Sequence, residues 1–289
     1  MEEDLASDHP EVTRLALRCG YLGDRFSGSQ VQAGARTVEG EFIAACLRLA
    51  LFSDPKSGRF QAAGRTDRGV HARGQVICIS TPSPERAITL LRYHLPADLW
   101  VTGYARVSPG FHPRHQAAHR TYRYFFGETD LDARAMDEAA RAFEGTCDFS
   151  LFSRPDGRDP VRTVLSARVF AESGIAVFEV RAESFLWHMV RYMASALFLV
   201  GSGEADGTLI ATRLNGDPCS QLSPAPPGGL VLWDVEYGFS FSPLDPGKKA
   251  RLFLEREWSA SRARACVAGH LAADAACPAG SEDPEENIP

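Results

Sequence analysis

The chain has 289 residues, 44% hydrophobic and 24% charged, which is enough for one large or two medium globular domains. Its formal charge of −6 becomes +4 for residues 13–264, because the two ends carry ten acidic residues and no Lys or Arg, so the acidic total does not exclude a nucleic-acid partner. The acidic N-terminus argues against a secretory signal, charged side chains interrupt the apolar run at residues 184–201, and seven scattered cysteines without a C-x-x-C pair favour a reducing cytoplasm.

The first part of the chain alternates strands with helices. Apolar alternation predicts strands at residues 14–21, 75–81 and 99–107. Apolar positions at helical spacing predict helices at residues 38–52 and 83–95. The glycine-punctuated stretch that ends before residue 76 predicts a loop.

The second part repeats this kind of order. We expect a strand at residues 120–126, two strands within 162–183 around a turn at Ser173–Gly174, and a last strand within 228–239. Helices are expected at residues 131–145 and 185–201. The order predicts an α+β fold with two similar halves, residues 13–108 and 109–244, each with helices on one face of a mainly antiparallel sheet. Residues 245–289 form a tail that is helical or disordered, with disorder expected over the last ~20 residues.

One carboxylate, Asp67, stands in the block "AAGRTDRGVHARGQV" among several basic side chains. Nearby arginines keep a carboxylate ionised, and such a group can act as a nucleophile. Gly64 and Gly69 bracket it and permit a tight turn that exposes the side chain. A surface turn with ordinary ion pairs explains the spacing equally well.

A second stretch mixes aromatic and basic side chains. No acid occurs from Trp100 to Gly127, and "RTYRYFF" places Tyr122 and Tyr124 on one face of a strand and Arg123 on the other. Aromatic rings that stack on bases and arginines that meet phosphates suit RNA. An aromatic core face of an antiparallel strand is the commoner meaning of the pattern.

Two further features have both a functional and a structural interpretation. His112, His115 and His119 could suggest a metal site, but Pro113 interrupts the helix that this spacing needs and no acid or cysteine lies among them, so we expect no metal. In the late apolar helix, a polar stripe predicts either a cleft wall or a buried ion pair: His188, Arg191 and Ser195.

With these residues assembled, residues 14–240 resemble the tRNA pseudouridine synthase A (TruA) family. The pieces that carry the resemblance follow the family's order: "YLGDRFSGSQ", "AAGRTDRGVHARGQV", "LPADLWV", "FHPRHQAAHRTYRYFF", "FLWHMVRYMASALFLVG" and "APPGGLVLWDVEY". The resemblance implies the pseudouridine synthase fold, in which two ferredoxin-like or RRM-like halves join into one extended sheet with a central basic cleft. It also implies a homodimer, without cofactor or metal, that isomerises uridine to pseudouridine in the anticodon stem-loop of tRNA, around tRNA positions 38 to 40.

The resemblance assigns roles residue by residue. Asp67 is the implied catalytic nucleophile, Arg65 its arginine partner, Tyr122 the ring that stacks on the flipped base, and Arg191 a second arginine at the carboxylate. Further contacts to RNA are expected from basic and polar side chains of the same stretches: Arg68, His71, Arg73, Gln75, Arg114, Arg120, Arg123 and His188. The sequence leaves open whether the carboxylate attacks the sugar or the uracil ring.

The chain departs from the family pattern at four positions: Leu22, Ser29, Arg68 and Ser184. These departures concern the choice of uridine and the grip on RNA rather than the implied chemistry. Two other functions are weighed against the leading one: an RNA-binding module without catalysis, and a hydrolase that releases the base. A hydrolase usually needs a second carboxylate, and none is evident near Asp67.

Overall fold

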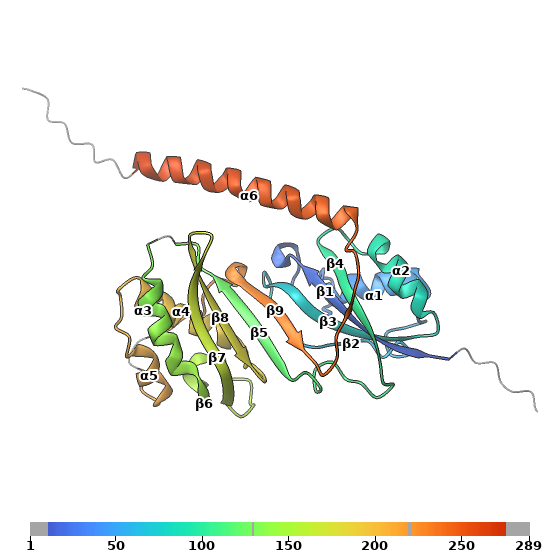
Figure 1. The fold of residues 1–289 in the computed structure, drawn as a ribbon, viewed down its shortest axis with the longest axis horizontal. Helices are drawn as coiled ribbons and strands as arrows, with labels where there is room; N and C mark the ends of the chain where they lie inside the picture. Colours follow the sequence, from blue (N-terminus) through green and yellow to red (C-terminus); the bar gives the residue numbers. More distant parts are fainter. Residues whose placement is uncertain (1–10, 129, 219–220, 276–289) are drawn as a thin grey trace, which may run out of the picture.

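A single sheet runs through the whole molecule (Figure 1). In the computed structural model, which describes residues 11–128, 130–218 and 221–275, ten strands pair in the order β10-β4-β1-β3-β9-β5-β8-β7-β6, and β2 pairs with β3 beside this path. The pairing of β3 with β9 is parallel, whereas the other pairings are antiparallel. The expected extended, mainly antiparallel sheet is therefore confirmed.

The elements have the following bounds. The strands are β1 (Thr13–Tyr21), β2 (Gln61–Ala62), β3 (His71–Thr81), β4 (Leu99–Val107), β5 (His119–Phe125), β6 (Gly145–Asp148), β7 (Val161–Glu172), β8 (Ile175–Ala182), β9 (Leu230–Glu236) and β10 (Ser242–Pro243). The helices are α1 (Val38–Arg48), α2 (Pro84–His94), α3 (Ala133–Ala140), α4 (Met189–Gly201), α5 (Leu209–Leu214) and α6 (Lys248–Ala275), with short 3-10 turns at Gly23–Arg25, Arg141–Phe143, Ser150–Phe152 and Pro227–Gly229.

The two halves have the same internal plan. In the N-terminal half the strands lie in the order β4-β1-β3-β2, with α1 and α2 as the connections. In the C-terminal half the order β9-β5-β8-β7 is the same once the additional strand β6 is left out of the count, and α3 and α4 take the corresponding places. This is the ferredoxin-like arrangement that the family resemblance implied, and the two similar halves agree with the order of elements in the sequence.

Each helix buries an apolar stripe against the sheet. Thr37 caps α1 by accepting a hydrogen bond from the Gly40 amide, and the helix buries Val38, Phe42 and Cys46. On the strand beneath the C-terminal helices, Tyr122 and Tyr124 are buried while Arg123 lies on the opposite face. One face of the sheet is thus covered by helices, and the other carries paired charges.

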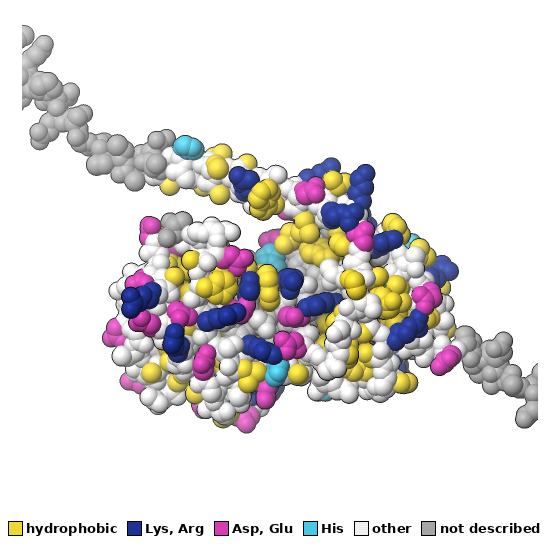
Figure 2. Space-filling view, viewed as in Figure 1, with side chains coloured by type: hydrophobic (Ala, Val, Ile, Leu, Met, Phe, Trp, Pro, Cys, Tyr) yellow, Lys and Arg dark blue, Asp and Glu magenta, His cyan; other side chains and the backbone are white. Residues whose placement is uncertain are grey.

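The open face of the sheet is visible in Figure 2, where blue and magenta side chains alternate over the central strands. Arg123 pairs with Glu179 at 2.7 Å, and Arg18 and Arg181 form ion pairs with Asp234 and Glu236. Because these charges are matched across neighbouring strands, this face is polar without being strongly basic.

The shortness of β2 creates the joint between the halves. β2 covers only Cys78 and Ile77 of β3, so the start of β3 remains free on that edge. There β9 pairs with it, His71 opposite Val231 and Ala72 opposite Leu232. His71 also ties the halves together, because its Nδ1 accepts a hydrogen bond from the Gly23 amide and its Nε2 lies 3.0 Å from the Gly228 carbonyl oxygen.

The structure differs from the predicted elements at several ends. The helix expected at residues 38–52 ends at Arg48, since Ala50 has a φ of +50°. The helix expected from residue 185 begins only at Met189, because His188 adopts the left-handed conformation. The stretch expected to be a loop contains β2 and the first residues of β3. The turn at Ser173–Gly174 is confirmed, with a φ of +54° and +83° at its two residues.

The tail beyond Asp245 is not irregular. The short strand β10 returns to the N-terminal half and pairs with β4, so the expected boundary at residue 244 falls after this return. The helix α6 then runs for 28 residues across the top of Figure 1. Its first turns are held by an ion pair between Arg25 and Glu257 at 3.1 Å. The expected disorder is wrong for residues 270–275, which belong to α6, and residues 276–289 lie outside the described part.

The joint between β3 and β9 depends on Gly74. A Cβ at this position would lie 2.7 Å from the Trp233 carbonyl oxygen and 2.9 Å from the Asp234 Cα. We therefore expect Gly74→Ala to push the two strands apart and to lower the free energy of unfolding by about 1–3 kcal/mol, measured by urea denaturation.

The matched control is Gly207→Ala, because a Cβ there meets nothing within 4 Å. The control should leave the denaturation midpoint unchanged. Equal stability of Gly74→Ala and Gly207→Ala would contradict the close approach of β9 to Gly74.

Candidate active site

A cleft of about 1150 Å³ lies where the two halves meet. Its N-terminal wall consists of residues 27–32 and of residues 63–70, which we call the Asp67 loop. Its C-terminal wall consists of residues 114–122, the loop around residues 156–158, and residues 183–191. The stretches selected from the sequence therefore converge on one site, although the residues of these walls run from Ser27 to Arg191 along the chain.

The Asp67 loop is fixed from behind by buried polar contacts. The Thr66 amide donates to the Ser29 hydroxyl at 2.9 Å, and the Ser29 amide donates to the Thr66 carbonyl at 3.0 Å. The hydroxyls of Tyr21 and Thr66 lie 2.8 Å apart, and Gln75 donates to the Gly64 carbonyl at 2.9 Å. A loop whose buried polar groups are satisfied in this way holds its exposed side chain in one position.

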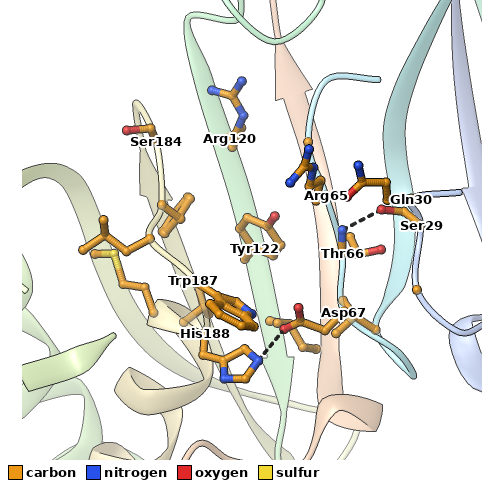
Figure 3. Close-up of a pocket in the computed structure, with 18 of the residues that line it drawn as sticks. Ser29, Gln30, Arg65, Thr66, Asp67, Arg120, Tyr122, Ser184, Trp187 and His188 are labelled. Atoms are coloured by element: carbon orange, nitrogen blue, oxygen red, sulfur yellow. Dashed lines mark hydrogen bonds and ion pairs between the residues drawn. The ribbon is translucent and has the colours of Figure 1, made fainter. Parts of the chain in front are cut away.

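The Asp67 side chain faces the cleft and is 34% exposed (Figure 3). His188 Nε2 lies 3.2 Å and Arg191 Nη1 3.6 Å from the same carboxylate oxygen, Oδ2. Arg191 is itself anchored, because its Nε donates to the Ala225 carbonyl at 2.6 Å. The carboxylate of the N-terminal half is thus held by two side chains of the C-terminal half.

Arg65 does not make the expected pair with Asp67 in this structure. Figure 3 shows its side chain pointing away from the carboxylate, toward the part of the cleft near Arg120. Burial raises the pKa of the Glu39 carboxyl, and the positive charge of Arg65 opposes this rise. The catalytic role expected for Arg65 remains a prediction, but the partners of Asp67 are His188 and Arg191.

Tyr122 forms the floor of the cleft between Arg120 and Asp67 (Figure 3). Its ring packs edge-on against Phe185, with ring centroids 5.0 Å apart. Burial raises the pKa of Tyr122 to about 12, so the phenol is neutral at physiological pH. A neutral, fixed ring at this place can stack on an extruded base, as expected.

Arg120 holds three separate wall segments together. Its guanidinium donates to the carbonyl oxygens of Glu183 at 2.7 Å, Ala63 at 3.1 Å and Arg114 at 2.6 Å. These carbonyls belong to both halves of the molecule. Backbone carbonyls thus take three of the five N–H donors of Arg120, which gives it a structural role, while its expected contact to RNA remains a prediction.

Four other side chains that were expected to contact RNA lie outside the cleft. Gln75 is 1% exposed and supports the Asp67 loop, and His71 uses both ring nitrogens at the joint. Arg123 and Arg73 stack on Trp233 on the open sheet face, at 3.9 Å and 4.6 Å from its ring centroid. Alternation along β5 explains the position of Arg123, because neighbouring side chains point to opposite faces. Arg73 and Gln75 lie on different faces despite their even spacing, because the register of β3 against β1 shifts between Ala72 and Gln75.

Sequence reasoning missed two residues of the cleft. Ser29, noted only as a departure from the family pattern, is buried and anchors the Asp67 loop. Trp187 is 38% exposed at the cleft wall, and the Arg154 guanidinium lies 4.3 Å from its ring centroid. The sequence could have indicated Trp187, because it is adjacent to His188 and does not belong to the apolar positions at helical spacing. Among the described residues, no group of three or more His, Cys, Asp and Glu is placed to hold a metal.

Comparisons with known proteins agree with this geometry. A family model described as a tRNA pseudouridine synthase matches residues 139–238, and with the fold and cleft it defines the class as pseudouridine synthase. A protein of Methanosphaerula palustris named tRNA pseudouridine synthase A is 54% identical over 239 residues, covering 82% of this chain and 85% of that protein. One of the same name from Methanoculleus marisnigri is 51% identical over 262 residues, covering 90% and 96%. The chain belongs to the tRNA pseudouridine synthase A family, as the sequence motifs led us to expect.

A solved structure is also similar in part. It is titled "Crystal Structure of a Cbf5-Nop10-Gar1 Complex", with a TM-score of 0.32 and 15% identity over 68% of this chain and 55% of that chain. A similarity this low carries no argument about the present protein.

The three hydrogen bonds of the Arg120 guanidinium should stabilise the cleft walls. We expect Arg120→Lys to lower the free energy of unfolding by about 1–3 kcal/mol, because one ammonium cannot donate to all three carbonyls at once. Thermal denaturation measures the loss, and amide hydrogen exchange should rise around residues 63, 114 and 183. Arg73→Lys on the open face is the control. An equal loss of stability in this control would contradict the stabilising role of the Arg120 hydrogen bonds.

Proposed function

We propose that this protein isomerises uridine to pseudouridine in the anticodon stem-loop of tRNA, with Asp67 as the nucleophile. The observation that carries the proposal is the placement of Asp67, which meets His188 and Arg191 in the cleft that Tyr122 also lines. Membership of the tRNA pseudouridine synthase A family supports the reaction and the RNA substrate.

The reaction needs few groups, and the cleft offers them. The bond between uracil N1 and the ribose C1′ breaks, the base turns, and C5 bonds to the same C1′. Asp67 adds to the substrate and later leaves, the proton of C5 is released, and N1 gains a proton, so no electrons are lost or gained. A uridine in a stem must first leave its stack, and Tyr122 offers an aromatic floor for it.

The charge of the cleft fits an RNA partner. Arg65, Arg68 and Arg114 are exposed at its walls and form no ion pair within the described part of the chain. Unpaired arginines are available to phosphate oxygens, and each one that meets a phosphate releases counterions. Arg158 also lines the cleft but is held by Asp156, whose pKa it lowers.

The homodimer that the resemblance implies and the cytoplasmic location that the cysteines favour are both part of this proposal. The residues around Asp67 all come from one chain, so each protomer of a dimer would hold its own site. Among the described residues, no helix is long and apolar enough to span a membrane.

Removing the nucleophile tests the reaction. On unmodified tRNA carrying tritium at uracil C5, the wild type should release tritium, and chemical mapping should place pseudouridine in the anticodon stem-loop. Asp67→Asn should lower the rate by at least about a thousandfold, because an amide cannot form the adduct. The variant should still bind tRNA, since no cleft arginine is lost.

Other outcomes would contradict this proposal in distinct ways. Full activity of Asp67→Asn would exclude Asp67 as the nucleophile. Release of free uracil would indicate a hydrolase, and tRNA binding by the wild type without any product would indicate a binding module. Pseudouridine outside the anticodon stem-loop would exclude the target while leaving the chemistry intact.

The arginines of the cleft and of the open face should differ in binding. We expect Arg68→Ala and Arg114→Ala each to weaken tRNA binding and to reduce the slope of log K against log salt by about 1, because each loses a phosphate contact. Arg73→Ala is the matched control, since Arg73 lies over Trp233 on the open face. Filter binding at several salt concentrations measures the slopes, and an equal change in the control would place the RNA over the open face instead.

A further inference from the structure

Two side chains hold one oxygen of Asp67 and leave the other free. His188 Nε2 and Arg191 Nη1 both approach Oδ2, at 3.2 Å and 3.6 Å. In the part of the chain that the structure describes, no hydrogen bond or ion pair reaches Oδ1 of Asp67. A carboxylate fixed through one oxygen presents the other in a defined direction, which is what a nucleophile requires.

The backbone of His188 is unusual for this purpose. His188 has φ +62° and ψ +3°, and it is one of four non-glycine residues with positive φ among those described, the only one of the four that lines the cleft. Such a conformation is unfavourable for a residue with a Cβ, and it clusters at functional sites when neighbours enforce it.

Neighbouring hydrogen bonds enforce the left-handed turn. The Tyr192 amide donates to the His188 carbonyl at 3.1 Å, and the Met189 amide donates to the Leu186 carbonyl at 3.2 Å. On the preceding residue, the Trp187 carbonyl accepts from the Arg154 amide at 2.9 Å. The turn therefore directs the His188 ring at the carboxylate instead of letting it follow the helix.

The surroundings of the ring favour its neutral form. Burial lowers the pKa of His188, and the positive charges of Arg191 and Arg154 lower it further, while Asp67 opposes this shift. A neutral imidazole that gives Nε2–H to a carboxylate orients it without adding a second full positive charge beside Arg191.

We propose that His188 is a positioning residue that donates from Nε2 to Oδ2 of Asp67 and thereby turns Oδ1 toward the flipped uridine. This replaces the contact to RNA expected for His188, and it rests on the proposed role of Asp67 as nucleophile. Arg191 supplies the charge and His188 the direction. The left-handed turn is the means by which the chain brings the ring to the carboxylate.

Two substitutions separate this role from a structural one. In His188→Gln the side-chain amide reaches the place of Nε2, whereas in His188→Asn it reaches only the place of Nδ1. Asparagine tolerates the left-handed conformation better than glutamine does. A structural role at the turn would thus favour the asparagine variant, and a positioning role would favour the glutamine variant.

We expect single-turnover rates of pseudouridine formation to be about 10–100-fold lower in His188→Asn than in the wild type, with an unchanged Kd for tRNA. His188→Gln should recover about tenfold of this loss. A faster asparagine variant, or equal rates for the two, would overturn the proposal. A large rise in Kd for both variants would indicate that His188 contacts RNA.

A spectroscopic measurement tests the contact without relying on activity. Nitrogen-15 spectra of the histidine rings, assigned by the loss of one signal in His188→Gln, should show His188 as the Nε2–H tautomer at neutral pH. The Nε2 signal should shift in Asp67→Asn. An Nδ1–H tautomer, or a signal that does not respond to Asp67, would overturn the inference even if the wild type is fully active. If the wild type forms no pseudouridine but the tautomer and its shift are found, the proposed reaction fails and the positioning contact stands.

Discussion

The parallel pairing of β3 with β9 is the contact on which the site depends. It exists because β2 is only two residues long and leaves the start of β3 open, and because Gly74 lets the β9 backbone approach closely. The Asp67 loop leads directly into β3, and Arg120 and Tyr122 lie on β5, the next neighbour of β9. A small shift at this joint would therefore separate Asp67 from the side chains that hold it.

The cleft combines rigid support with a few available charges. Behind the Asp67 loop, Ser29 and Gln75 satisfy the buried backbone, and across the cleft Arg120 binds three carbonyls. These polar side chains preorganise the cleft, because the buried groups that they satisfy keep the walls in one position. The arginines that remain exposed are free to meet a polyanion. Arginine thus has two roles in the cleft: bound to backbone carbonyls it holds the walls, and exposed at the walls it is available to the substrate.

Strand geometry separates the arginines that were expected to contact RNA. Arg73 and Arg123 lie on the face of the sheet that the helices leave open, where both stack on Trp233. Arg120, three residues before Arg123, lies at the cleft. The sequence identifies these arginines, but the face of the sheet on which each guanidinium lies depends on strand register. Register in turn depends on which strands become neighbours.

The sequence by itself determined the class of fold and the central acid. Periodicity located most strands and helices, and the block around Asp67 with the aromatic run and the M-V-R stretch identified the family, because motifs of this kind combine residue types that the chemistry needs. Tertiary structure decided the partners of Asp67. Arg191 lies at the carboxylate as the resemblance implied, and His188 takes the place expected for Arg65, because a left-handed residue delays the start of the predicted helix and turns the histidine toward the other half. A contact between residues more than 100 positions apart, made through a strained backbone, follows from packing and hydrogen bonds that no local pattern records.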